Sequence, residues 1–215
     1  MNSDATMDLK TTTLKDLVSN EVNTMRKLIL FGDSNTYGYD PRGYLGGRYP
    51  EDVRWTTHVR KALKDNYEVI DEGMNGRMLP EIGYGLFTTV IQGLSREDVF
   101  VMMLGTNDIL LTNHPNVEAT LKKLDSILNY VNKNCLATFI LIAPPYISAL
   151  THEMQLYHEC SVKMNEGYMN LAKTYNIKAI DAGLWNIEMG VDGVHFSMEG
   201  HKHFATSLLK FFEIM

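Results

Sequence analysis

The sequence predicts an α/β protein, a three-layer α/β/α sandwich built around a five-stranded parallel sheet. Short apolar runs alternate five times with longer stretches of helical periodicity, the order that parallel strands joined by right-handed crossovers require. Residues 99–104 are apolar at every position, as in a central strand covered on both faces. Polar turns follow the runs, and turns of this kind gather at the carboxyl edge of a parallel sheet.

Five apolar runs are predicted as strands, and most of them stop at a turn rich in Gly, Asp, Asn or Pro: residues 28–31, 69–70, 99–104, 138–142 and 177–180. Apolar residues three or four positions apart predict helices over 55–63, 80–94, 117–131, 154–171 and 197–211. Pro80 is favoured as the first residue of a helix, and Ser197 as the cap of the last one. Residues 39–54 are rich in Gly, Tyr, Pro and Arg and predict a long loop.

The 215 residues suffice for one domain, which we place at residues 25–215. Residues 1–24 differ in pattern and are predicted as an N-terminal extension without a chemical role. A short helix capped by Thr13, at a contact between subunits, is the alternative.

Composition argues against several classes of protein. Hydrophobic residues make up 45% and charged residues 21%, as in soluble globular proteins, and the net charge of −6 disfavours nucleic-acid and anionic-membrane partners. No apolar run approaches the ~20 residues that span a bilayer, and the polar N-terminus lacks the pattern of a signal peptide. Cys135 and Cys160 are predicted as reduced thiols of a cytoplasmic protein, with one disulfide left open.

Five residues on strand-end turns can converge at one edge of the sheet: Ser34, Gly76, Asn107, Asp192 and His195. A serine hydroxyl is a weak nucleophile until an adjacent base takes its proton, and His195 can be that base. Asp192 can hold the imidazole in the required tautomer, since an Asp-x-x-His spacing lets one loop carry both side chains.

Attack on an ester carbonyl creates an oxyanion, which needs donors. The backbone N–H groups of Ser34 and Gly76 and the side-chain amide of Asn107 can supply them, and a glycine at 76 would let the backbone approach closely. Each residue alone has a simpler interpretation: Ser34 as a helix cap, Gly76 as a conformational glycine, Asn107 as a turn residue and His195 as a structural histidine. Their joint occurrence in this order favours a catalytic site.

Four blocks carry a resemblance to a known family: Gly32-Asp33-Ser34-Asn35, the Glu72-to-Arg77 segment with Gly76, Gly105-Thr106-Asn107-Asp108, and Asp192-Gly193-Val194-His195. In this order they resemble the blocks of the SGNH (GDSL-type) serine hydrolase superfamily. The resemblance implies a flavodoxin-like fold and an esterase or acyltransferase mechanism without a cofactor. It implies that Ser34 is the nucleophile, His195 the base, Asp192 the orienting acid, and Gly76 and Asn107 oxyanion donors. Asn35 stands where many members carry Leu, a variation that the superfamily tolerates.

Within the superfamily the sequence is most similar to the arylesterase and acyltransferase-like branch, which implies small or medium carboxylic esters as substrates. Alternatives are a deacetylase of O-acetylated carbohydrate and, from another class, a non-catalytic flavodoxin-like ligand-binding module. Assembly as a homo-oligomer is left open. Tyr44, Trp55 and Tyr146 are candidates for substrate contact because they lie near loops at the active edge. For Trp55 the alternative is packing under the first long helix.

The remaining polar residues of these blocks are assigned structural roles. Asp33 is expected to accept local backbone N–H groups and brace the turn, and Asp108 is also read as structural. We expect no metal site, because His201 and His203 are two positions apart on a helix and point in different directions. His201 is expected to support the His195 loop.

Overall fold

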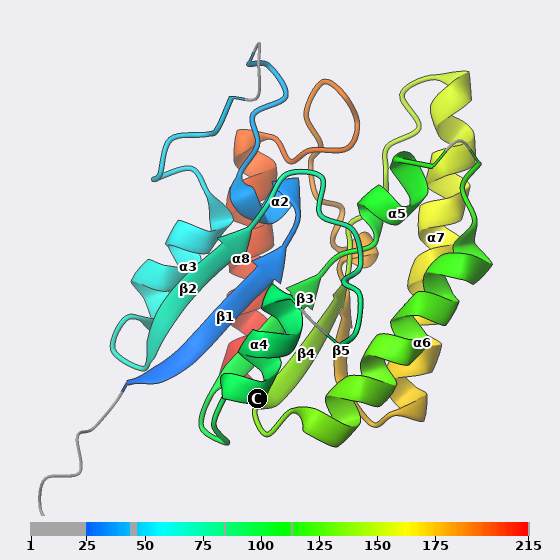
Figure 1. Cartoon of the computed structure of the whole chain (residues 1–215). Helices are drawn as coiled ribbons and strands as arrows, with labels where there is room; N and C mark the ends of the chain where they lie inside the picture. The colour runs from blue at the N-terminus through cyan, green and yellow to red at the C-terminus, as the bar shows by residue number, and fades with distance from the viewer. Residues whose placement is uncertain (1–24, 44–46, 84, 113, 215) are drawn as a thin grey trace, which may run out of the picture.

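Residues 25–43, 47–83, 85–112 and 114–214 are described by the structure, a computed structural model of the chain. Within them, five strands form one sheet in the order β2-β1-β3-β4-β5, and every neighbouring pair is parallel (Figure 1). The predicted fold class is therefore confirmed. The strands are β1 (Arg26–Gly32), β2 (Tyr67–Gly73), β3 (Val99–Met103), β4 (Thr138–Ala143) and β5 (Lys178–Asp181).

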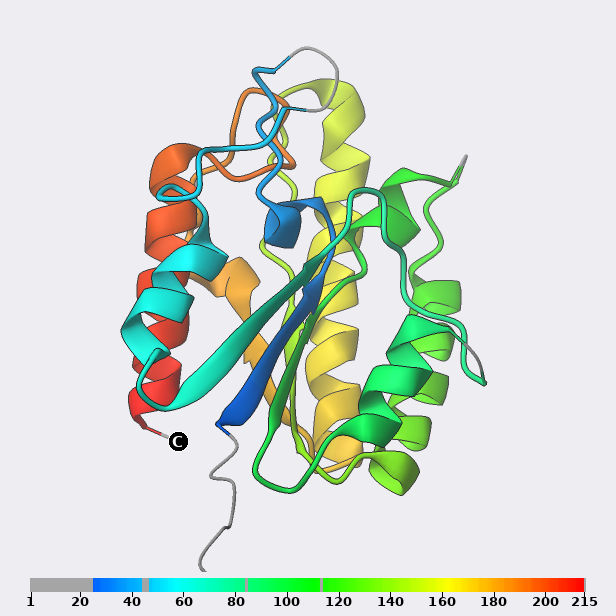
Figure 2. The same ribbon diagram turned by 60° about the vertical axis from the view of Figure 1, so that its left-hand side comes forward.

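Helices cover both faces of the sheet (Figure 2). One face carries α3 (Trp55–Leu63) and α8 (Met198–Glu213). The opposite face carries α4 (Leu86–Gly93), α5 (Thr106–Leu110), α6 (Val117–Asn134) and α7 (His152–Thr174). A one-turn helix, α2 (Ser34–Tyr37), follows β1, and a 3-10 turn, η1 (Ala182–Trp185), follows β5. Because the strands alternate their side chains between the faces, each helical layer has its own apolar core.

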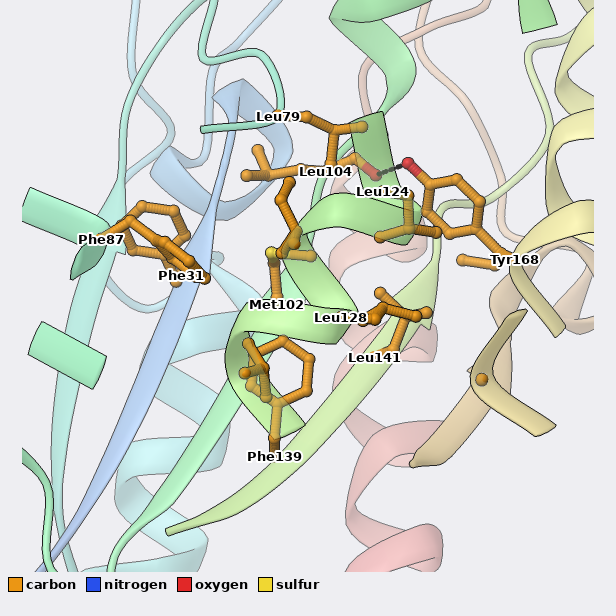
Figure 3. Packing of buried hydrophobic residues seen from close by; sticks show 14 of the residues in the cluster. Phe31, Leu79, Phe87, Met102, Leu104, Leu124, Leu128, Phe139, Leu141 and Tyr168 are labelled. Atoms are coloured by element: carbon orange, nitrogen blue, oxygen red, sulfur yellow. Dashed lines mark hydrogen bonds between the residues drawn. The ribbon is translucent and has the colours of Figure 1, made fainter. Parts of the chain in front are cut away.

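The core on the α6 and α7 face centres on Phe100, which is fully buried. Its ring stacks on Phe139 with centroids 5.5 Å apart, and it also contacts the rings of Phe31 and Phe87. In Figure 3, Phe31 lies against Phe87, and the leucines of α6 and β4 belong to the same core. Aromatic packing of this kind holds β1, β3 and β4 in fixed relation and so fixes where their ends lie.

The register of the strands brings together the turns that follow β1, β2 and β3. Gly32, at the end of β1, pairs with Gly73 of β2 on one side and with Met103 of β3 on the other. A side chain at Gly73 would collide with the backbone of Tyr37, so the first turn of α2 lies directly against the end of β2. The segments that follow β1, β2 and β3 therefore begin side by side.

Two elements differ from the sequence prediction. The helix predicted from Pro80 begins only at Leu86, because Gly83 and Gly85 have φ values of +109° and +93°, which a helix does not contain. The strand predicted at residues 69–70 is seven residues long, Tyr67–Gly73, since all seven pair with β1. It is an edge strand with several polar residues, so its sequence contains only a short apolar run.

Other expectations are settled more simply. The Ser197 hydroxyl caps α8 by accepting the Gly200 N–H at 3.0 Å, as predicted. Cys135 and Cys160 are free thiols. No helix in the described part of the chain combines the length and the apolar character needed to cross a membrane. The N-terminal extension at residues 1–24 lies outside the described residues and stays a prediction.

Tyr168 links α7 to the strand that leads into the Asn107 turn. Its ring is fully buried, and its hydroxyl donates to the Leu104 carbonyl at 3.0 Å (Figure 3). Tyr168→Phe leaves that buried carbonyl without this donor, so we expect the free energy of unfolding to fall by about 1–3 kcal/mol. Chemical denaturation measures the change.

Tyr175→Phe is the matched control. The Tyr175 hydroxyl bonds to Asp125 at 2.8 Å near the surface, where water replaces the lost partner. We expect a smaller loss, about 0.5 kcal/mol. Equal losses in the two variants would show that the buried hydrogen bond to Leu104 stabilises the fold no more than the one near the surface.

Candidate active site

Ser34 stands at the point where β1 turns into α2. Asp33 is the N-cap of α2, and its carboxylate accepts the Asn35 N–H at 2.9 Å. Gly38 ends the helix after one turn with a φ of +84°, in the left-handed region. Ser34 is therefore the first residue of a short helix held at both ends, and the predicted bracing role of Asp33 agrees with this geometry.

A second loop carries Asp192 and His195 and precedes α8. The Asp192 Oδ1 atom accepts the backbone N–H groups of Val194 and His195, both at 3.0 Å. The other oxygen, Oδ2, lies 2.6 Å from His195 Nδ1. Asp192 thus shapes the loop and orients the imidazole with one carboxylate.

The structure brings the two segments together. His195 Nε2 lies 2.8 Å from Ser34 Oγ, although the residues are 161 positions apart. With Nδ1 donating its proton to Asp192, Nε2 is the acceptor for the serine hydroxyl. Ser34, His195 and Asp192 form one continuous hydrogen-bonded chain, the arrangement in which a histidine can activate a serine.

The charge of Asp192 is held in place by its donors. Its partial burial opposes ionisation, but the hydrogen bonds from the His195 ring and from the N–H groups of His195 and Val194 outweigh that effect. Together they lower the pKa of Asp192 to about 2. Asp192 is therefore a carboxylate throughout the neutral range.

Tyr39 covers the imidazole from the side. Its ring centroid lies 4.4 Å from that of His195, at an angle of 44°. The contact restricts rotation of the imidazole. Nothing in the sequence singled out Tyr39, because a tyrosine in a long loop carries no spacing signal.

The segment after β2 and the first turn of α5 meet beside this pair. Gly76 lies in a turn closed by the Arg77 N–H on the Met74 carbonyl at 3.2 Å. Asn107 belongs to α5, is buried, and donates from Nδ2 to the Arg77 carbonyl at 3.0 Å. That amide nitrogen carries two hydrogens, so one is left for another acceptor.

The structure adds a conformational reason for glycine at position 76 to the close approach predicted from sequence. A Cβ there would meet nothing within 4 Å, whereas the φ of +70° lies in the region that other residues avoid. The backbone conformation of the turn therefore favours glycine, and the close approach to the reacting centre stays a prediction.

Comparison with known proteins agrees with the site. The chain matches the model of the GDSL-like lipase/acylhydrolase family over residues 30–203, a range that includes all five residues of the candidate site. The chain belongs to this family.

Solved structures of esterases share the fold. The native aryl esterase of M. smegmatis is 22% identical, with a TM-score of 0.74 and coverage of 87% of this chain and 98% of that one. A carbohydrate acetylesterase family member from Sinorhizobium meliloti is 24% identical, with a TM-score of 0.74 and coverage of 88% and 98%. An acetylxylan esterase from Geobacillus stearothermophilus is 20% identical, with a TM-score of 0.65 and coverage of 86% and 93%. Comparison with curated protein sequences finds no match.

Arg77 is a structural residue of this GDSL-like site that sequence analysis did not single out. It is 9% exposed, its Nη1 atom donates to the carbonyls of Gly32 and Glu72, and its guanidinium lies 4.1 Å above the Phe31 ring. Burial lowers its pKa, which the charges of Glu72 and Asp33 oppose. One cation thereby joins the ends of β1 and β2.

The candidates for substrate contact fare differently from one another. Trp55 is 1% exposed, packs on Phe204 with ring centroids 4.8 Å apart, and is unavailable to a ligand, so its predicted role is corrected in favour of packing. Tyr146 is half-buried and borders a cavity of about 290 Å³ with His158 and Met189. Tyr44 lies outside the described residues.

The histidines of α8 separate as predicted. His201 is fully buried and packs against the ring of Phe196, the residue that follows His195. Burial, together with the charges of His58 and Arg54, lowers the pKa of His201 to about 3. His203 is exposed. Among the described residues, no group of three or more His, Cys, Asp or Glu side chains is arranged to hold a metal ion.

Two buried carboxyl groups flank the GDSL-like site. Asp108 accepts the Leu79 N–H at 2.8 Å, which fits its predicted structural role, and burial raises its pKa. Asp33 is 2% exposed. Burial raises its pKa to about 6, against the opposing effects of the Asn35 N–H and the His195 charge.

Asp33 therefore makes stability depend on pH. Its pKa is higher in the folded than in the unfolded chain, so between about pH 4 and pH 6 the folded protein keeps a proton that the unfolded chain releases. The stabilisation of the folded protein by this proton is complete below about pH 4 and is lost as the pH rises to about 6.

Asp33→Asn removes this titration. Relative to the wild type, the free energy of unfolding of the variant should rise by about 2–3 kcal/mol between pH 4 and pH 8. Denaturant titrations at both pH values measure it. Asp65→Asn, at an exposed aspartate, is the control and should move the difference by about 0.5 kcal/mol or less. A constant difference for Asp33→Asn would contradict the raised pKa.

Proposed function

We propose that this GDSL-family esterase hydrolyses small or medium carboxylic esters through an acyl-enzyme intermediate on Ser34. The observation that carries the proposal is the continuous chain of hydrogen bonds from Ser34 Oγ through His195 to Asp192, at 2.8 and 2.6 Å. Membership of the family supports an esterase activity, and the geometry supports the assignment of roles.

In the first half of the reaction, Ser34 Oγ attacks the carbonyl carbon of the ester while His195 Nε2 takes the hydroxyl proton. The carbonyl oxygen becomes an oxyanion, which the N–H groups of Ser34 and Gly76 and the free hydrogen of Asn107 Nδ2 would stabilise. The intermediate collapses when the bond to the alcohol oxygen breaks. His195 gives its proton to that oxygen, and the alcohol leaves.

In the second half, His195 takes a proton from water, whose oxygen attacks the acyl carbon. Collapse breaks the bond to Ser34 Oγ, and the proton returns from His195 to the serine. The products are a carboxylic acid and the free enzyme. An alcohol in place of water would give a new ester, which is the acyl-transfer alternative.

Apolar side chains at the catalytic edge favour esters with apolar groups. Four residues that are half exposed or more lie on the segments that follow the strands on this edge: Met74, Leu111, Leu150 and Val191. The aryl esterase of M. smegmatis and the carbohydrate acetylesterase of S. meliloti support the two substrate classes, aromatic esters and acetylated sugars. Exposed apolar residues favour the aromatic esters. A homo-oligomeric state and a cytoplasmic location stay predictions.

Ser34→Ala tests the nucleophile. Loss of the attacking oxygen should lower kcat/KM for p-nitrophenyl acetate by about 10³-fold or more. Ser126→Ala, at an exposed serine of α6, should keep wild-type turnover. A phosphonate directed at serine should attach to Ser34, as located by mass spectrometry of peptides. Full turnover in Ser34→Ala would overturn the proposal.

Asp192→Asn tests the orienting acid. The amide keeps the shape of the carboxylate but removes its charge and favours the wrong imidazole tautomer, so kcat should fall by about 10²–10⁴-fold. Steady-state kinetics measures the loss, with the exposed variant Asp65→Asn as the control. An unchanged kcat in Asp192→Asn would show that the 2.6 Å contact is structural only.

A further inference from the structure

We propose that Asn35 is a positioning residue that holds the His195 loop against the nucleophile turn and thereby sets the distance between imidazole and hydroxyl. The inference rests on the proposed function and adds to it a residue outside the triad and the oxyanion donors. Asn35 occupies the position directly after Ser34 and is 5% exposed.

The Asn35 side chain binds the backbone on both sides of His195. Its Nδ2 atom donates to the Val194 carbonyl at 3.1 Å, and its Oδ1 atom accepts the Phe196 N–H at 2.9 Å. A planar amide that binds two points of a loop fixes both its distance and its rotation. The residue held between those two points is the proposed base.

The backbone of Asn35 is fixed as firmly as its side chain. Its N–H donates to Asp33 Oδ1 at 2.9 Å, and its carbonyl accepts the Trp55 indole N–H at 2.9 Å. The two side-chain hydrogen bonds of Asn35 form a clamp on the His195 loop. Asn35 shares a peptide bond with Ser34, so the nucleophile and the clamp move as one body. This assigns Trp55, which does not reach the substrate, to the support of the clamp.

Other hydrogen bonds shape the His195 loop without joining it to α2, and the Tyr39 ring packs on the imidazole without a hydrogen bond. The bonds of Asp192 and the bond from the Gly190 N–H to the His195 carbonyl lie within the loop itself. The Gly193 carbonyl accepts the Ser148 N–H, from the segment after β4. Among the described residues, the hydrogen bonds that join residues 190–197 to α2 are the two of Asn35 and the Ser34–His195 bond itself.

Without the Asn35 amide the loop would keep its internal hydrogen bonds but lose the two that join its backbone to α2. The buried Phe196 N–H would lose its acceptor, and the imidazole could move relative to the hydroxyl. A displacement of about 1 Å at reacting groups lowers rates by about 100-fold. The loss should fall on kcat, because the Asn35 side chain is buried and both of its polar atoms are bonded to the loop.

Asn35→Leu is the main test, and it removes both hydrogen bonds while filling a similar volume. We expect kcat for p-nitrophenyl acetate to fall about 10–100-fold with KM changed less than about threefold. The rate of phosphonate attachment to Ser34 should fall in parallel, since it reports activation of the hydroxyl. Asn35→Asp keeps the acceptor for Phe196 and loses the donor to Val194, so its kcat should lie between those of Asn35→Leu and wild type.

The control is Asn165→Leu. Asn165 is also a buried asparagine, and its Nδ2 atom donates to the Pro144 carbonyl and to Asp181, which belong neither to α2 nor to residues 190–197. This variant should lose stability while the folded enzyme keeps its kcat, and thermal unfolding of all variants identifies the folded fraction. The contrast separates lost positioning from lost stability.

The outcomes distinguish the two proposals. Wild-type kcat in folded Asn35→Leu, with Ser34→Ala inactive, would overturn the clamp and leave the esterase mechanism standing. Turnover in Ser34→Ala would overturn the mechanism itself. An equal fall in kcat for Asn165→Leu would also overturn the clamp, because any buried asparagine would then have the same effect.

Discussion

The structure depends on one constraint, the parallel pairing of β1 with β2 on one side and β3 on the other. Parallel strands end at the same edge, so the segments that carry Ser34, Gly76 and Asn107 leave the sheet as neighbours. Burial of both faces keeps this pairing in register, because a slip of one residue would turn every core side chain to the wrong face. The site is thus a consequence of how the core packs.

Hydrogen bonds of two kinds complete the site on that frame. Local bonds, such as those of Asp33 and Asp192, set the shape of each turn. Long-range bonds, such as those of Arg77 and Asn107, join one turn to the next. Buried polar groups of this kind have a defined geometry only when their partners are present, which ties the position of each turn to that of its neighbours.

Much of this could be predicted from sequence, for identifiable reasons. The apolar runs and helical periods revealed the sheet and its layers, and the order of Ser34, Gly76, Asn107 and His195 indicated which turns meet. The length of the edge strand β2 was underestimated because its polar residues leave only a short apolar run. The start of α4 was predicted too early, at Pro80, because the glycines after the proline determine where the helix begins. Long-range contacts such as Tyr39 on His195 and Trp55 on Asn35 were out of reach, since they depend on how loops close over the sheet.

The short span between Asp192 and His195 has a consequence for how the site assembles. Base and orienting acid lie three positions apart and are bonded within their own loop, so a movement of the loop as a whole leaves their contact unchanged. The contact between His195 and Ser34 joins positions 161 apart, so it depends on how the whole sheet brings the two segments together. A displacement of this loop would therefore break the contact to Ser34 while the contact between Asp192 and His195 stays in place.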